Sequence, residues 1–156
     1  MTLDRFFERI EVDNRRKPGT HTLEAPLTDR ELLLWEKTHP GWTVPDSLIG
    51  LLRRSNGFRL RLDKDFAGGA YCCFSALKEI RKAAPAMYGE DCDGDECPKS
   101  WFALAQDSDS TSFLVLDMKE GVYLDVDPID ADEPTRLSKS IEGALNWLAN
   151  YFPEGR

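Results

Sequence analysis

The sequence has 156 residues, 41% of them hydrophobic and 31% charged, a balance typical of a globular protein. No apolar run approaches the ~20 residues of a membrane-spanning helix, and the N-terminus lacks the apolar core of a signal peptide, so we expect a cytoplasmic protein that does not bind membranes. The net charge of −8 argues against direct nucleic-acid binding, because neutralising phosphates requires an excess of lysine and arginine.

The N-terminal region is predicted to be helical. A short helix over residues 2–10 has Thr2 as its cap and an apolar face of Phe6, Phe7 and Ile10. A basic segment that contains a proline and a glycine then ends this helix.

Two further helices have residues that specify where each begins and ends. The first follows Thr28, where Glu31 completes a T-x-x-E capping box, and Pro40-Gly41 ends it. The second is predicted to start at Pro45, whose fixed φ suits the first helical position. Asn56-Gly57 is expected to end it, because glycine readily adopts a left-handed conformation.

The order of these signals is informative. An acidic residue late in one helix precedes a V-P-D start, an apolar helix and an Asn-Gly end; these residues are Glu36, Val44-Pro45-Asp46, Leu48, Leu51-Leu52 and Asn56-Gly57. The arrangement resembles the SMI1/KNR4 (SUKH) family. Phe74-Ser75, Leu77 and Glu79-Ile80 extend the resemblance, which covers roughly residues 28–152.

The central part of the chain is predicted to form a sheet. Five segments have strand-like patterns: 58–62, 70–74, 101–105, 112–116 and 122–126. Short turns between the last three indicate antiparallel pairing. Between these strands, a helix starting at Ser75 and a long loop over residues 85–100 are expected.

A final helix closes the predicted domain. It opens at Ser138 and carries Ile141, Leu145, Leu148 and Phe152 on one face. The expected fold is therefore α+β, with N-terminal helices, a central antiparallel sheet and a closing C-terminal helix in a single domain over residues 1–156. This order also resembles the SMI1/KNR4 fold.

The sequence contains no residue pattern that indicates a particular catalytic reaction. His21 and His39 lie in no metal-ligand spacing, and no hydrolase or nucleotide-binding motif occurs. His39 is placed to stabilise the end of a helix. We therefore predict a protein that is not an enzyme and has no cofactor.

Two places in the sequence have residues that could bind a metal ion. The acidic stretch 90–97 imitates a calcium loop, but its glycine falls fourth and position twelve is Phe102, so the EF-hand pattern fails. Cys92 and Cys97 could join Cys72-Cys73 in a zinc site, but adjacent strand residues point to opposite faces. Weak binding of a hard cation, or of zinc, is an alternative that these residues leave open.

Negative charge is concentrated in one segment. Residues 90–133 hold 14 Asp/Glu and 2 Lys/Arg, a net charge of −12, whereas residues 1–89 carry +3. Such a segment favours a basic protein partner. The residues selected by this charge count are Asp91, Asp93, Asp95, Glu96, Asp107 and Asp109.

The family resemblance implies a function in protein binding. Many bacterial members are immunity proteins against toxins, often nucleases, and an acidic surface could cover a nuclease's basic active surface. A regulatory or scaffold protein of the same fold is the first alternative. A carboxylate- or metal-dependent hydrolase is the second, because acidic residues are abundant.

Overall fold

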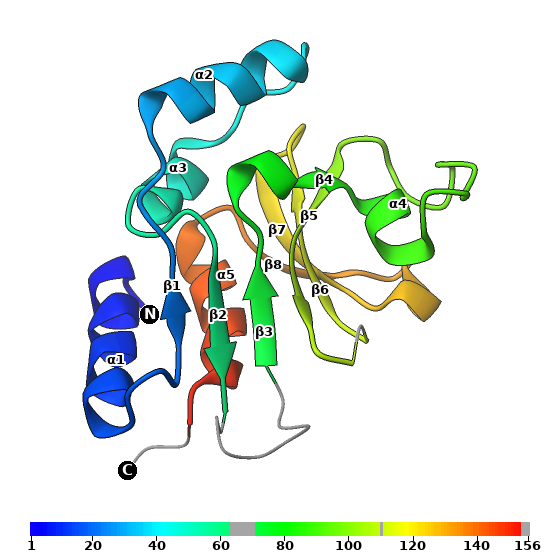
Figure 1. Ribbon diagram of the computed structural model, residues 1–156. Coiled ribbons are helices and arrows are strands. Elements are labelled where there is room, and N and C mark those ends of the chain that lie inside the picture. Colours follow the sequence, from blue (N-terminus) through cyan, green and yellow to red (C-terminus); the bar gives the residue numbers. More distant parts are fainter. Residues whose placement is uncertain (63–70, 110, 154–156) are drawn as a thin grey trace.

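The computed structural model describes residues 1–62, 71–109 and 111–153 (Figure 1). The helices are α1 Leu3–Arg16, α2 Asp29–Thr38, α3 Asp46–Leu52, α4 Ala83–Tyr88 and α5 Ile141–Leu148, with 3-10 turns η1 Leu77–Glu79, η2 Pro128–Asp130 and η3 Ala149–Tyr151. The strands are β1 Thr22–Leu23, β2 Phe58–Arg61, β3 Tyr71–Phe74, β4 Arg81–Lys82, β5 Trp101–Asp107, β6 Phe113–Asp117, β7 Val122–Val126 and β8 Thr135–Ser138. Within these ranges, no helix is long and apolar enough to cross a membrane.

The strands form one antiparallel sheet. In the described ranges it has eight strands in the order β1-β2-β3-β5-β6-β7-β8, and β4 pairs with β5 beyond the end of β3. Tight connections bring β5, β6 and β7 together as sequential neighbours. The predicted α+β class, with its antiparallel sheet and closing C-terminal helix, is confirmed.

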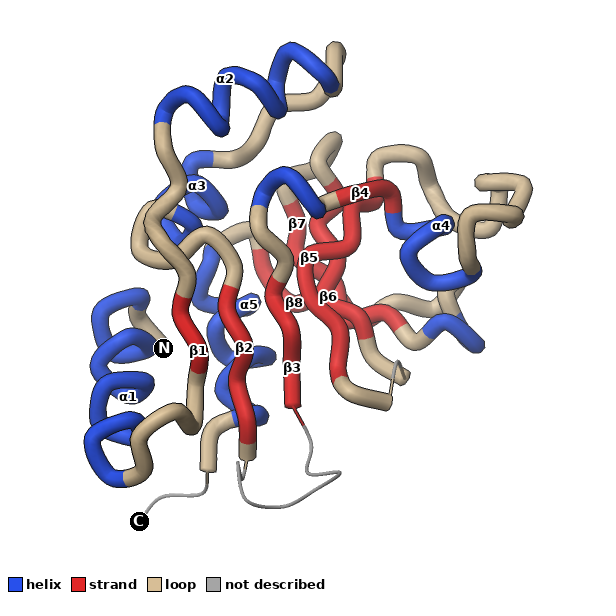
Figure 2. The backbone as a smooth tube through the Cα atoms, in the orientation of Figure 1, coloured by secondary structure: helices blue, strands red, loops and turns tan. Residues whose placement is uncertain are grey.

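Each face of the sheet is packed against a different group of residues. We call the larger group the first core; it joins α1, α2, α3 and α5 to one face through side chains such as Phe6, Trp35, Leu48 and Leu145. The second core covers the opposite face over β5, β6 and β7, where α4 contributes Ala83 and Ala84. Figure 2 shows α1 and α5 on one side of the molecule and α4 on the other.

The predicted capping box of α2 is confirmed. The Thr28 hydroxyl accepts a hydrogen bond from the Glu31 backbone N–H at 3.2 Å, and the Glu31 carboxylate accepts one from the Thr28 N–H at 3.1 Å. At α3 the prediction is wrong by one residue, because Pro45 is the extended N-cap and the helix begins at Asp46. Proline suits this position too, since its ring fixes φ and it has no N–H to satisfy.

Asn56-Gly57 does not end α3, which stops at Leu52 four residues earlier. Gly57 does have a positive φ of +93°, but this conformation belongs to a tertiary contact and not to a helix end. A Cβ atom there would lie 2.8 Å from the backbone nitrogen of Ala76 and 3.1 Å from the carbonyl oxygen of Phe74. Glycine therefore lets the start of β2 approach the end of β3.

The region after β3 differs from the predicted helix. Ser75 does not cap a helix; the chain instead makes the turn η1, the short strand β4 and then α4. The apolar residues Leu77, Ile80 and Ala84 are nevertheless buried, as predicted. The expected loop over residues 85–100 begins within α4, which continues to Tyr88.

Both ends of the chain are more regular than predicted. α1 runs to Arg16 instead of residue 10, and its buried residues include the predicted Phe6, Phe7 and Ile10. At the other end, Ser138 belongs to the unpredicted strand β8, and α5 begins after Ser140.

Candidate functional site

Four of the six predicted partner-binding residues lie together in the turns after α4. These are Asp91, Asp93, Asp95 and Glu96, and all four are exposed. Cysteines attach this segment to the protein, because Cys97 is buried in the second core and Cys92 packs against that core. The carboxylates are therefore presented to solvent.

The structure places a second acidic segment beside the first. Asp127, Asp130, Asp132 and Glu133 lie in and around η2, and all are exposed. The Tyr88 side chain joins the two segments. Tyr88 is the last residue of α4, and its hydroxyl donates a hydrogen bond of 2.6 Å to the carbonyl oxygen of Pro128. Figure 1 shows α4 next to the turn that follows β7.

The environment of Tyr88 confirms that these charges are close. Burial raises the pKa of the Tyr88 phenol, and nearby negative charges raise it further. These neighbours are Cys97, Glu96, Asp127 and Asp132. A phenolate would add another negative charge to this group, so the phenol stays protonated and keeps its hydrogen bond.

We define the acidic surface as residues 90–96 and 127–133, which contain nine Asp/Glu and no Lys/Arg. Within it, Ile129 is 89% exposed, more than any other large hydrophobic residue in the described ranges. Tyr88 is 38% exposed next to it. Exposed apolar side chains among charged residues occur in many protein interfaces, where the apolar centre supplies affinity and the charges supply steering.

The other two predicted residues lie elsewhere. Asp107 ends β5, and its carboxylate accepts hydrogen bonds from the Thr111 backbone N–H at 2.9 Å and hydroxyl at 2.8 Å, so it holds the β5–β6 turn. Asp109 is exposed near that turn. Burial raises the pKa of Tyr151 in η3, next to α5, and the nearby charges of Asp107, Asp125 and Asp109 raise it further. The structure therefore groups Asp107 and Asp109 on the α5 side, apart from the acidic surface.

Sequence reasoning missed the pairing of the two acidic segments. The charge count included residues 127–133 in the acidic segment 90–133, but nothing in the spacing placed them beside residues 90–96. The available signal was Ile129, an aliphatic residue among aspartates with no alternating pattern around it. Single exposed apolar residues are common on protein surfaces, so Ile129 becomes informative only together with Tyr88 and the surrounding carboxylates.

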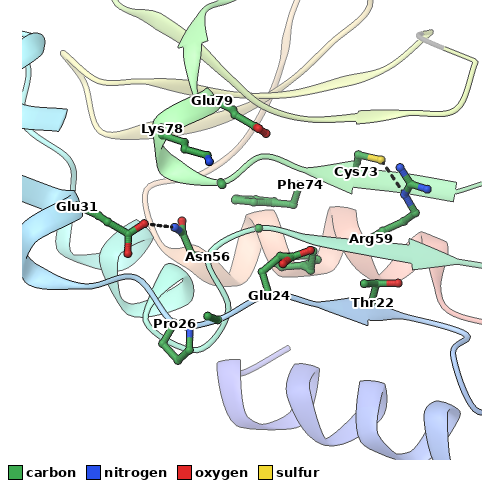
Figure 3. Close-up of a pocket in the computed structure, with 14 residues that line it drawn as sticks. Thr22, Glu24, Pro26, Glu31, Asn56, Arg59, Cys73, Phe74, Lys78 and Glu79 are labelled. Atoms are coloured by element: carbon green, nitrogen blue, oxygen red, sulfur yellow. Dashed lines mark hydrogen bonds between the residues drawn. The ribbon is translucent and has the colours of Figure 1, made fainter. Parts of the chain in front are cut away.

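A groove of about 560 Å³ opens over β1, β2 and β3 (Figure 3). Arg59 and Cys73 line one end, and Glu31, Lys78 and Glu79 line the other. It lies on the same face of the sheet as α4, since directly opposite residues of paired strands share a face. One such row crosses the sheet through Thr22, Arg59, Cys73, Gln106 and Phe113, and the last belongs to the second core.

The two histidines have structural contacts. The His39 ring stacks on Trp35 with centroids 4.0 Å apart, and its Nδ1 lies 2.8 Å from the Trp35 carbonyl oxygen at the end of α2. His21 is buried, with Nε2 3.0 Å from the Asp13 carboxylate. Over the described residues, no three His, Cys, Asp or Glu side chains are grouped as metal ligands.

Comparison with known proteins identifies the family. A profile of the SMI1/KNR4 family (SUKH-1) matches residues 26–147, most of the chain. The chain belongs to the SMI1/KNR4 family. No curated protein matches it.

The SMI1/KNR4 match includes most, but not all, of the described elements. It covers α2 through most of α5 and includes both segments of the acidic surface. It leaves out α1 and β1, so Thr22 and Glu24 at the rim of the groove lie outside the matched residues. Part of the groove is therefore made by a region that the SMI1/KNR4 profile does not describe.

Proposed function

We propose that the protein is a non-enzymatic binding protein that neutralises a basic bacterial toxin, of the nuclease type, through its acidic surface. Membership of the SMI1/KNR4 family supports a protein-binding role. The observation that carries the proposal is the joining of two acidic segments around Tyr88 and Ile129. The carboxylates of this surface, of which only Glu90 is in an ion pair (with Arg81) among the described residues, complement the cationic surface that a nuclease uses to hold phosphates.

The charged residues and the apolar residues of the acidic surface are expected to contribute to different steps of binding. Exposed carboxylates attract a basic partner over about 10 Å and raise the rate of encounter. Ile129 and Tyr88 supply apolar area that is removed from water when the complex forms, which slows dissociation. The bound acidic surface then blocks the nuclease from its nucleic acid without any chemical step.

The test uses the intact protein as bait in an extract of its native host. A variant with Asp91, Asp93, Asp95 and Glu96 all changed to lysine is the comparison. The bait should capture one basic protein, and adding the bait to that purified protein should abolish its cleavage of plasmid DNA or RNA. The lysine variant should fail in both assays.

Two results would contradict the proposal. Equal capture of the partner by the lysine variant would show that the acidic surface is not part of the interface. A captured protein without toxic or nuclease activity would indicate instead a regulatory or scaffold role. Circular dichroism of the variant controls for folding, and all four substituted side chains are exposed.

A further inference from the structure

The groove over β1, β2 and β3 is a second place where the surface is shaped for a ligand. Its volume of about 560 Å³ lies within the range of binding pockets. In β2 and β3, buried Phe58, Leu60, Cys72 and Phe74 alternate with outward-facing residues, so the polar side of both strands lines the open face. None of its lining residues belongs to the acidic surface.

The charges around the groove have both signs. Glu24, Arg59, Lys78 and Glu79 are exposed, and none is in an ion pair with another described residue. Glutamates at the rim would repel a phosphate backbone, so a nucleic acid does not fit. A polypeptide segment with acidic and basic side chains does fit.

Of these residues, Arg59 is the best positioned to bind a ligand in the groove. Its guanidinium lies over the Tyr71 ring at 5.2 Å from the centroid, and its Nε donates a hydrogen bond to Cys73 Sγ at 3.3 Å. Within the part of the chain that the structure describes, the terminal amino groups make no hydrogen bond or ion pair, and Arg59 lines the end of the groove. Because a planar guanidinium binds a carboxylate with two parallel hydrogen bonds, Arg59 is suited to an acidic side chain.

The walls of the groove are already fixed. Asn56 is buried, its Oδ1 accepts a hydrogen bond from the Leu77 N–H at 2.9 Å, and its Nδ2 donates to Glu31 at 3.1 Å. Through these bonds Asn56, which lies just before β2, is connected both to α2 and to η1. A ligand would therefore bind without the loss of entropy that ordering a loop requires.

We propose that this groove binds an extended peptide segment of a partner protein. An acidic side chain of the peptide pairs with Arg59 at one end of the groove, and a basic side chain pairs with Glu79, which lies with Lys78 at the other end. The groove is thus a second contact surface, independent of the proposed toxin-binding surface.

The test is a selection of random heptapeptides displayed on phage against the intact protein. Affinities of the recovered peptides are then measured by fluorescence polarisation. We expect enrichment of an acidic residue at one position, and Arg59→Glu should weaken binding at least about tenfold, the effect of losing a charge-assisted hydrogen bond. Changing the selected acidic residue to lysine should restore binding to that variant.

Two controls make the result specific. Arg136→Glu introduces the same change at an exposed residue of β8 and should leave peptide affinity unchanged. The four-lysine variant of the acidic surface should also bind the peptides normally, which separates this inference from the proposed function. Failure to recover any peptide above background, or equal binding to the Arg59→Glu variant, would overturn the inference.

Discussion

Glu31 and Asn56 connect α2, the turn before β2 and η1 through a chain of hydrogen bonds. Oε1 of Glu31 accepts hydrogen bonds from the N–H and hydroxyl of Thr28, and Oε2 accepts one from Asn56 Nδ2 at 3.1 Å. The residue that caps α2 therefore also holds the turn before β2. The same Asn56 accepts from the Leu77 N–H, so the contact reaches η1.

Asn56→Ala should lower the free energy of unfolding by about 2 kcal/mol, because it leaves the buried Leu77 N–H without an acceptor. Urea denaturation measures this change. Asn150→Ala, at an exposed asparagine, is the matched control and should stay within about 0.5 kcal/mol of the parent protein. Equal effects at the two positions would show that the Asn56 contacts contribute nothing.

Gly57→Ala should be more damaging than Gly41→Ala, although both glycines have positive φ. At Gly57 the new Cβ would meet the backbone of Ala76 at 2.8 Å, whereas at Gly41 nothing lies within 4 Å. We expect a loss of about 3 kcal/mol at Gly57 and about 1 kcal/mol at Gly41. Thermal or urea unfolding distinguishes them, and similar losses would contradict a close approach of β2 and β3.

The stability of the protein should fall as the pH decreases from 7.5 to 5.5. The Arg61 N–H donates to Nδ1 of His21 at 3.1 Å, so Nδ1 carries no proton and the ring is neutral, with Nε2–H donating to Asp13. Burial lowers the pKa of His21 below 6.5, against the raising effect of Asp13. The unfolded chain therefore binds a proton that the folded chain does not, and stability present above pH 6.5 is lost as the pH falls through the lowered pKa.

Urea midpoints at the two pH values test this dependence. His21→Gln keeps a donor and an acceptor but does not titrate, so its midpoint should change less between pH 7.5 and 5.5. His39→Gln, at the end of α2, should retain the dependence of the parent protein. An identical pH profile for the parent and the His21→Gln variant would exclude His21 as the cause.

The two components of the acidic surface should affect different rate constants. Changing Asp130, Asp132 and Glu133 to their amides should lower the association rate with the captured toxin about tenfold at low salt. Ile129→Ala should leave that rate unchanged and raise the dissociation rate, because the side chain acts only after contact. Surface plasmon resonance at two salt concentrations measures both rates. An association rate that does not depend on salt would contradict electrostatic steering.

Local signals predicted the elements that depend on local contacts. The capping box at Thr28 and Glu31 satisfies backbone groups within one turn, so the sequence contains all the information needed. Strands β5, β6 and β7 were predictable for a similar reason, since each is a run of apolar residues bounded by polar turns.

Elements that depend on tertiary contacts were missed. β1 and β4 have two residues each, too few to show a period, and form because β2 and β5 offer a free edge. Gly57 was interpreted as a helix end, but its conformation serves the contact with Ala76. Likewise, a charge count found the acidic stretch 90–133 but not the Tyr88 hydrogen bond that brings its two ends together.

The position of α1 has a practical consequence for producing this protein. Residues 26–147 match the family, yet the Phe58 ring lies 5.7 Å from that of Phe6 and 6.4 Å from that of Phe7, both on α1. A fragment trimmed to the matched residues would expose this aromatic surface and is expected to aggregate. Expression boundaries should therefore begin before α1 and extend past Phe152, whose ring also contacts Phe6.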